Sequence, residues 1–273
     1  MANEAIAAGH IMVWEVIVGA ASKAPKFLKE TGYRNPTKPR DGLMQYAFQT
    51  KLDIFGLLAT MPDIQRAFDT FMGNTMGARE YWVDWYPVEE RILTGAESNT
   101  PLIVDVGGGK GHDLVAFHEK YPGRGKLVLQ ELQPVIDNIK SLNSVAEPSW
   151  CSTHDFFTEQ PIQGARVYFY HHILHDWPDE KCVEILKHAK KAMTPGYSKL
   201  LLHELILPEQ GASVLQARFD LVMMAFNSGM ERTGKQWRVL LEMAGFEVVK
   251  LWVPGDSDAD GLVEAVVMED ASI

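Results

Sequence analysis

Cysteine is nearly absent from this sequence, with only two in 273 residues. Cys151 and Cys182 form no C-x-x-C motif, so neither a zinc knuckle nor a disulfide scaffold is indicated. So few cysteines suit a reducing compartment, and we expect a cytoplasmic protein. Basic residues are also outnumbered: 26 lysines and arginines face 36 acidic residues, which gives a net charge of −10. Because the basic residues are scattered along the chain, we expect no nucleic-acid partner.

A comfortable membrane span is also missing. The most apolar stretch, residues 5–21 (AIAAGHIMVWEVIVGAA), is short for a span and contains His10 and Glu15. No basic segment precedes it, so a signal peptide is not expected. A helix that is apolar nearly all round does not stand alone in water. We therefore predict a helix packed against the rest of the chain or against a second subunit, and no membrane partner.

The pattern of apolar residues changes near residue 98. Before it, apolar residues recur at helical spacing, as in 54–61 and 64–72, with a Pro/Gly-rich turn at 34–42. After residue 100 the apolar runs are continuous, which is typical of buried strands. These runs occupy residues 101–109, 126–132, 166–171, 199–207, 246–253 and 261–269. We expect a helical N-terminal region, 1–98, followed by a second domain, 99–273.

Helical stretches alternate with these runs, notably at 112–121 and 179–193. That alternation predicts a parallel α/β sheet with helices packed on it. The last two runs are separated by only about eight residues, too few for a helical crossover. The predicted fold is therefore a doubly wound α/β sheet that ends in an antiparallel hairpin.

A glycine-rich turn, DVGGGKG, follows the first predicted strand. It places Asp105, Gly107, Gly109 and Gly111 between a strand and a helix, where glycines let a ligand approach the backbone and the helix N-terminus. The spacing does not match the dinucleotide fingerprint G-x-G-x-x-G. The acid before the loop suits a ligand with an ammonium group better than it suits a pyrophosphate.

Two further acids follow at the ends of later segments. Glu131 ends the second predicted strand about twenty residues after the loop, where an acid usually accepts hydrogen bonds from ribose hydroxyls. In HDFF, Asp155 and Phe156 could bind an adenine amine and stack on its ring. The HDFF signal is weak alone.

The segment YHHILHDWPDE, residues 170–180, contains three histidines. His171 and His175 have the i,i+4 spacing of two metal ligands on one helix face. However, the segment is predicted as a strand that runs into a loop, and it has neither a cysteine partner nor an HExxH-like pattern. We therefore expect no metal. Asp176 precedes Trp177 and Pro178, a pattern typical of a helix start.

Taken together, these motifs resemble the metal-independent S-adenosylmethionine-dependent O-methyltransferases, of the type that acts on plant phenylpropanoids and fungal aromatic metabolites. The resemblance is carried in order by DVGGGKG, QELQPVI, HDFF, HHILHDWPDE, HELILPE, DLVMMAFNSGMERT and LLEMAGFEVV. GYRNPT and MQYAF resemble the fungal branch. The resemblance implies a Rossmann-like sheet of seven strands with S-adenosylmethionine as the cofactor.

The resemblance also implies roles for particular residues. His175 would be the general base that removes a phenolic proton, with Glu204 and Glu231 beside it. Leu132 and His171 would join the cofactor site, and His171 stands where plant relatives have a lysine near the adenine. The implied substrate contacts are Phe68, Met72, Met223 and Asn227.

Members of this family usually run about a hundred residues longer at the N-terminus, where a dimerisation domain precedes the connecting helices. We expect a homodimer that acts on a small aromatic substrate. Two alternatives remain open. Some fungal members of this group bind S-adenosylmethionine and catalyse pericyclic or dehydration steps without methyl transfer. A truncated form without activity is the other.

Overall fold

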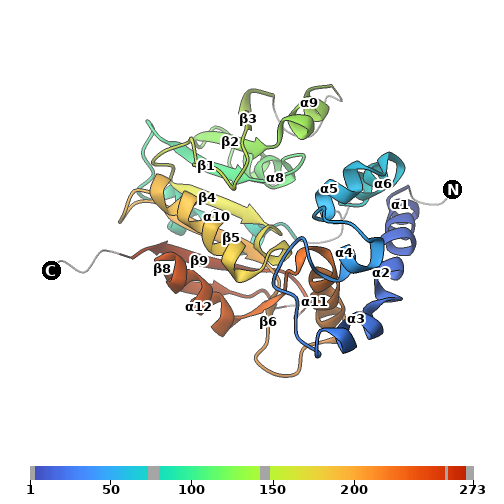
Figure 1. Ribbon diagram of the computed structural model, residues 1–273. Helices are drawn as coiled ribbons and strands as arrows, with labels where there is room; N and C mark the ends of the chain where they lie inside the picture. Colours follow the sequence, from blue (N-terminus) through green and yellow to red (C-terminus); the bar gives the residue numbers. More distant parts are fainter. Residues whose placement is uncertain (1–3, 73–79, 142–147, 256–257, 269–273) are drawn as a thin grey trace. The chain divides into compact units, whose positions relative to one another are not determined.

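The computed structural model describes residues 4–72, 80–141, 148–255 and 258–268 (Figure 1). It contains two compact units that alternate along the chain. The smaller unit comprises residues 1–79, 174–179 and 212–231, and the larger comprises 80–173, 180–211 and 232–273. Residues 80–98 thus belong to the same compact unit as the sheet. The expected domain division after residue 98 stays a prediction.

A seven-stranded sheet forms the centre of the larger unit, in the order β3-β2-β1-β4-β5-β9-β8. The first five strands in this order pair in parallel, whereas β9 is antiparallel to both β5 and β8. The strands are β1 Pro101–Val106, β2 Lys126–Glu131, β3 Cys151–Thr153, β4 Val167–His171, β5 Lys199–Glu204, β8 Phe246–Trp252 and β9 Gly261–Val267. The predicted sheet and its terminal antiparallel hairpin are confirmed. Two short strands, β6 Ile206–Leu207 and β7 Arg232–Thr233, pair separately.

Helices of the larger unit cover this sheet, and Figure 1 shows α10 and α12 across one of its faces. The helices are α7 Trp82–Trp85, η2 Glu89–Leu93, α8 His112–Lys120, α9 Gln133–Ser141, η3 Pro148–Trp150, α10 Asp179–Ala192 and α12 Gly234–Ala244. A buried aromatic core joins α7 and α8 to the sheet. In it, Trp82 lies 6.2 Å from Phe117 and 5.0 Å from Phe169 between ring centroids.

Strand register sets which side chains meet at the carboxyl edge of the sheet. Asp105 on β1 pairs with Phe169 on β4, and His171 at the end of β4 pairs with His203 on β5. In a parallel sheet the carboxyl ends of the strands lie at one edge, where ligands of open α/β sheets bind. The polar residues at the carboxyl ends of β1, β4 and β5 therefore lie at one edge of this unit.

The smaller unit is all helical. Its elements are α1 Glu4–Met12, η1 Val13–Val18, α2 Gly19–Ala21, α3 Ala24–Glu30, α4 Leu43–Phe48, α5 Ile54–Ala59, α6 Pro62–Met72, η4 Leu174–Asp176 and α11 Val214–Asn227. Its buried core includes Phe27, Met44, Leu58 and Phe226. The unit is assembled from three separate segments of the chain, and this core draws on the N-terminal helices and α11.

The apolar N-terminal stretch is helical, as predicted, and is buried on one face. Ala8, Met12, Val16 and Ala20, four residues apart, are buried, whereas Trp14 on the other face is 65% exposed. The helical stretch 4–30 has the length and composition of a membrane-crossing helix, which alone is weak evidence for a membrane span.

Candidate functional site

The glycine loop lies where the sequence predicts it, between β1 and α8. Gly107, Gly109 and Gly111 all have positive φ, at 74°, 55° and 79°, which favours glycine strongly. A Cβ on Gly107 would lie 2.7 Å from Cδ1 of Ile173, so the loop also packs too closely for a side chain. Both constraints place the loop backbone directly against the end of β4.

Asp105 at the end of β1 is fully buried beneath this loop. A Cβ on Gly108 would overlap its carboxyl group. Neither carboxyl oxygen has a hydrogen-bond partner among the described residues. Burial, together with the negative charges of Asp113 and Glu131, raises the pKa of Asp105 well above its ordinary value. A positively charged ligand group beside this carboxyl would counteract both effects and favour its ionised form.

Glu131 and the HDFF segment lie beside the loop in the same unit. The Glu131 carboxylate accepts hydrogen bonds from the N–H of Gly109 at 3.1 Å and of Leu132 at 2.8 Å. The Asp155 carboxylate accepts from the N–H of Phe157 at 3.0 Å. A Cβ on Gly107 would lie 3.6 Å from Phe156, so this ring is close to the loop. The structure thus brings the loop, Glu131 and Phe156 together.

His171, the last residue of β4, pairs with a residue that the sequence analysis did not single out. Its Nδ1 lies 2.7 Å from a carboxylate oxygen of Asp113, the second residue of α8. Burial raises the pKa of Asp113, but attraction to His171 outweighs that effect and leaves the pKa below its ordinary value. An ionised carboxylate only accepts hydrogen bonds, so Nδ1 of His171 carries the proton.

Two groups of three side chains at this edge have ligand atoms within 4.8 Å of one another. They are Asp113, His171 and His203, and His171, His172 and Asp260. In both groups the carboxylate lies close to a histidine nitrogen, at 2.7 Å and 3.1 Å. The distances would permit a cation, but both carboxylates are already engaged by imidazole nitrogens.

His175 lies in the smaller unit, in the short helix η4, and is buried. Its Nδ1 is 2.9 Å from Oε1 of Glu231, which is 2% exposed. The backbone holds the pair in place, because the N–H of Met230 donates to the His175 carbonyl at 2.9 Å. A Cβ on Gly229 would overlap that carbonyl, so only glycine allows this approach.

A neutral His175 that donates Nδ1–H to Glu231 keeps its lone pair on Nε2. Nε2 is 3.8 Å from the carboxylate of Asp176, within η4. The carboxylate of Glu231 would also stabilise the imidazolium formed when Nε2 accepts a proton. This is the arrangement that a general base needs.

Glu204 belongs to the larger unit, at the end of β5, and is fully buried. Its carboxylate accepts a hydrogen bond from the N–H of Ile173 at 3.2 Å. Ile173 lies two residues before His175 along the chain. The predicted role of Glu204 beside the base stays a prediction.

The four predicted substrate contacts all belong to the smaller unit. Phe68 packs against Phe55, with ring centroids 6.5 Å apart, and Phe55 packs in turn against Trp177 at 6.2 Å. Met72 is 39% exposed, whereas Met223 is buried. Asn227 is fully buried and accepts a hydrogen bond from the N–H of Ile54 at 2.8 Å, so its side chain supports the start of α5.

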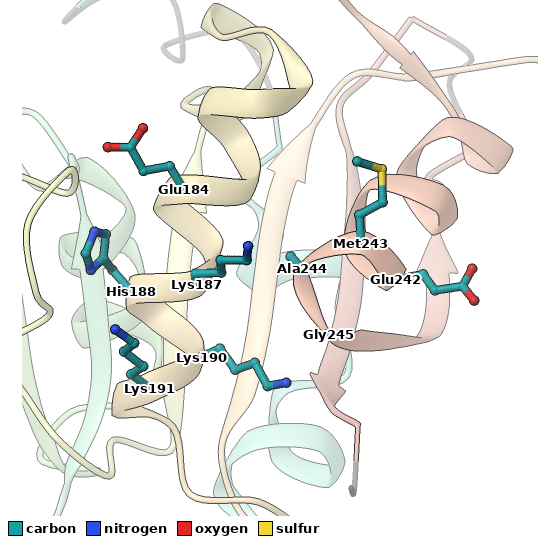
Figure 2. Close-up of a pocket in the computed structure, with 9 residues that line it drawn as sticks. All are labelled: Glu184, Lys187, His188, Lys190, Lys191, Glu242, Met243, Ala244 and Gly245. Carbon is teal, nitrogen blue, oxygen red and sulfur yellow. The ribbon is translucent and has the colours of Figure 1, made fainter. Parts of the chain in front are cut away.

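A surface pocket of about 470 Å³ lies elsewhere, between α10 and α12 (Figure 2). None of the predicted site residues lines it. Its lining combines lysines 187, 190 and 191 with Glu184 and Glu242, and a Cβ on Gly245 would overlap the Lys190 ammonium group. Gly245 caps the end of α12, where a positive charge complements the helix dipole. Lys190 therefore has a structural role.

Sequence reasoning missed Asp113, His203, Gly229 and Asp260. Asp113 follows the last glycine of the loop by two residues, and that position was the available signal. The sequence contained no comparable signal for His203 and Asp260, because their contacts with His171 and His172 depend on strand register.

Comparison with known proteins adds a direct assignment. A family model described as an O-methyltransferase domain matches residues 46–247. The O-methyltransferase asqD of Emericella nidulans is 50% identical over 97% of this chain and 68% of its own length. The O-methyltransferase penC of Penicillium thymicola is 49% identical over 97% of this chain and 66% of its own. The chain thus spans about two thirds of the length of these relatives.

Solved structures agree with this assignment. LepI in complex with SAM superposes with a TM-score of 0.90 at 30% identity, covering 98% of this chain and 68% of that one. A structure described as a pericyclic reaction enzyme gives 0.89 at 29% identity, over 97% and 68%. OxaC with sinefungin and meleagrin gives 0.85 at 29% identity, over 97% and 67%. Together with the glycine loop and the His175–Glu231 pair, these likenesses establish that the chain belongs to the O-methyltransferase domain family.

Proposed function

We propose that this chain is the catalytic part of an O-methyltransferase that moves a methyl group from S-adenosylmethionine to a phenolic hydroxyl of a small aromatic metabolite. We also propose that the protein is a cytoplasmic homodimer and belongs to the fungal O-methyltransferases of secondary metabolism. The single observation that supports it most is the buried pair between Nδ1 of His175 and Glu231, 2.9 Å apart.

The pair supplies what the reaction needs from the protein. A phenol has a pKa near 10, and a histidine near neutrality can take its proton as the oxygen attacks. A base of this kind typically contributes about 10²–10⁴-fold in rate. Glu231 fixes the tautomer of the neutral ring and stabilises the imidazolium that forms. Glu204 would support the base from the end of β5.

The residues of the larger unit fit the cofactor. S-adenosylmethionine supplies a methyl group already activated on a sulfonium. Asp105, buried without a partner in the described part of the chain, would receive the cationic amino-acid portion. Glu131 would bind the ribose beside Leu132, and Asp155 and Phe156 would hold the adenine. Gly107 and Gly109 would let the ligand approach the loop, and His171 would contact it from the end of β4.

Phe68, Met72, Met223 and Asn227 would contact the substrate, whose flat ring suits thioether and aromatic side chains. We propose that no metal takes part, because the proton is removed by an imidazole and the methyl donor needs no Lewis acid.

A second candidate function is a pericyclic or dehydration step that uses bound S-adenosylmethionine without methyl transfer. The similarity to a structure described as a pericyclic reaction enzyme favours it. A chain that does not catalyse a reaction is a third. The His175–Glu231 pair favours methyl transfer over both, because removal of a phenolic proton needs an oriented base of this kind.

The test is transfer of label from methyl-labelled S-adenosylmethionine to a panel of phenolic metabolites. We expect transfer by the unaltered protein, a loss of about 10²-fold or more in His175→Ala, and a smaller loss in Glu231→Gln, which keeps the hydrogen bond but not the charge. His10→Ala is the matched control, because His10 is an exposed histidine of the same unit.

Cofactor binding without label transfer, combined with a changed product from an unmethylated polyene or quinone-methide precursor, would favour the second function. No affinity for the cofactor by calorimetry would leave the third. Loss of turnover in EDTA, restored by a divalent cation, would contradict the metal-independent mechanism.

A further inference from the structure

Five titratable side chains form one cluster, which we call the His–Asp cluster, at the carboxyl edge of the sheet. They are Asp113, His171, His172, His203 and Asp260. The His171 ring lies 4.1 Å from His203 and 4.5 Å from His172 between centroids. His172 has a φ of 52°, and this left-handed backbone turns the chain directly after β4. Such a concentration of polar groups is costly to bury unless each is paired.

The charges of the cluster follow from its contacts. Burial, together with repulsion from His171, lowers the pKa of His203 well below its ordinary value, so this ring is neutral. Burial raises the pKa of Asp260, but attraction to His172 outweighs that effect and lowers it overall. The cluster thus contains two ionised carboxylates, each against one histidine, and the neutral ring of His203 lies tilted against His171.

The two pairs differ in their relation to the glycine loop. Asp113 lies in the first turn of α8, two residues beyond the loop, and its negative charge acts on Asp105 beneath the loop. Its partner His171 ends β4, the strand next to β1. Asp260 precedes β9, which lies on the far side of β5 from β4. Only the first pair adjoins the strand that carries the loop.

Within the described residues, the second nitrogen of His171 is left without a hydrogen bond. Nε2 is buried and makes no hydrogen bond to any residue that the structure describes. Because Nδ1–H is held by Asp113, the ring cannot rotate to pair Nε2 without breaking that bond. A buried, oriented and unpaired nitrogen is a group that a bound ligand can satisfy.

We propose that Asp113 is a positioning residue for cofactor binding. It fixes the tautomer and orientation of His171, so that Nε2 is presented to the nucleoside cofactor. This inference rests on the proposed function for the identity of the cofactor. The Asp260–His172 pair stabilises the fold at the neighbouring edge and leaves cofactor affinity unchanged.

The first experiment measures the affinity for S-adenosylmethionine by calorimetry in Asp113→Asn and in Asp260→Asn. Both variants remove a buried carboxylate paired with a histidine, so both lower the thermal unfolding temperature. We expect about a tenfold or greater rise in the dissociation constant for Asp113→Asn, and a change below about twofold for Asp260→Asn. In steady-state assays Asp113→Asn should raise KM for the cofactor and alter kcat little.

A double-mutant cycle then tests whether Asp113 acts through His171. His171→Gln alone should weaken binding, and adding Asp113→Asn to it should weaken binding little further. Additive losses would overturn the proposal, because Asp113 would then act by another route. Equal losses of affinity in Asp113→Asn and Asp260→Asn would overturn it as well.

The ¹⁵N shifts of the His171 ring give a test in the unaltered protein, even if a variant does not fold. We expect a protonated Nδ1, and an Nε2 signal that moves when S-adenosylhomocysteine is added. An unprotonated Nδ1, or an Nε2 signal that the ligand does not move, contradicts the proposal. Loss of cofactor binding in EDTA, restored by zinc, also overturns it, since the cluster would then hold a metal. A protein that binds no cofactor at all refutes the proposed function instead.

Discussion

Asp105 is fully buried at the end of β1 and, within the described residues, has no hydrogen-bond partner for either carboxyl oxygen. A buried polar group without a partner destabilises the fold, so a side chain of this kind persists where a ligand needs it. Charge and burial raise its pKa. The residue that we place against the cationic part of the cofactor therefore costs stability while the site is unoccupied.

Replacing Asp105 by Asn should raise the thermal unfolding temperature at pH 7 and abolish measurable affinity for S-adenosylmethionine. The unfolded carboxyl ionises near its ordinary pKa of 3.8, whereas the folded one has a higher pKa. The contribution of Asp105 to the free energy of unfolding therefore decreases as the pH rises from the unfolded pKa to the folded pKa. The gain in unfolding temperature should be small at pH 4 and larger at pH 7.

Asp137→Asn, on the exposed side of α9, is the control and should leave both properties unchanged. An Asp105→Asn variant that is less stable at neutral pH than the unaltered protein would refute this interpretation of Asp105.

Among single residues, the sequence was sufficient to identify those that lie close together along the chain. Asp105, the loop glycines and Glu131 occupy one continuous strand–loop–helix–strand segment, so spacing was enough to find them. Asp113 and Gly229 were missed because their roles depend on contacts with residues 58 and 54 positions away along the chain. His175 itself was named by resemblance, and its partner Glu231 by the same route.

Among the elements, the terminal hairpin is joined to the rest of the sheet by the pairing of β5 with β9 and also by one buried carboxylate. Glu264 on β9 is fully buried and accepts hydrogen bonds from Arg91 at 2.6 Å, Lys199 at 2.8 Å and the Trp252 indole at 3.0 Å. These partners lie on η2, β5 and β8. Burial raises the pKa of Glu264, but the two cations outweigh that effect and lower it overall.

Glu264→Gln should therefore destabilise the protein by about 3 kcal/mol, because it leaves two cations facing a neutral group. The pKa is lower in the folded state, so the stabilisation is present above about pH 4.5, the ordinary value, and is lost as pH falls below it. Chemical denaturation at pH 7 and at pH 4 measures both effects.

Glu247→Gln on β8 is the matched control, since this side chain is exposed. Equal free energies of unfolding for the two variants at pH 7 would contradict the assignment of Glu264 as the ionic link of the hairpin.

The sheet was predictable because continuous apolar runs mark buried strands, and six of its seven strands were found in this way. β3 was not, since its three residues, Cys151–Thr153, are partly exposed and carry no apolar run. The strand order β5-β9-β8 could not be read from the sequence either. It inserts the last strand between two earlier ones, and only pairing in space determines that.

For the whole molecule, the main feature is that each compact unit is built from three segments that alternate along the chain. The smaller unit takes its core from the N-terminal helices and from α11, and it also includes η4 with His175. A change in apolar pattern near residue 98 cannot reveal this, because the two later segments lie between strands of the larger unit. The proposed base and the proposed cofactor residues consequently belong to different units.

A single measurement tests the proposed role of His175 most directly. It is a crystal structure with S-adenosylhomocysteine and a phenolic substrate bound. We expect Nε2 of His175 within about 3.2 Å of the phenolic oxygen and Glu231 still paired with Nδ1. We expect the cofactor sulfur on the side of that oxygen that faces away from Nε2. A bound phenol whose oxygen contacts neither His175 nor a water molecule held by it would contradict the proposed mechanism.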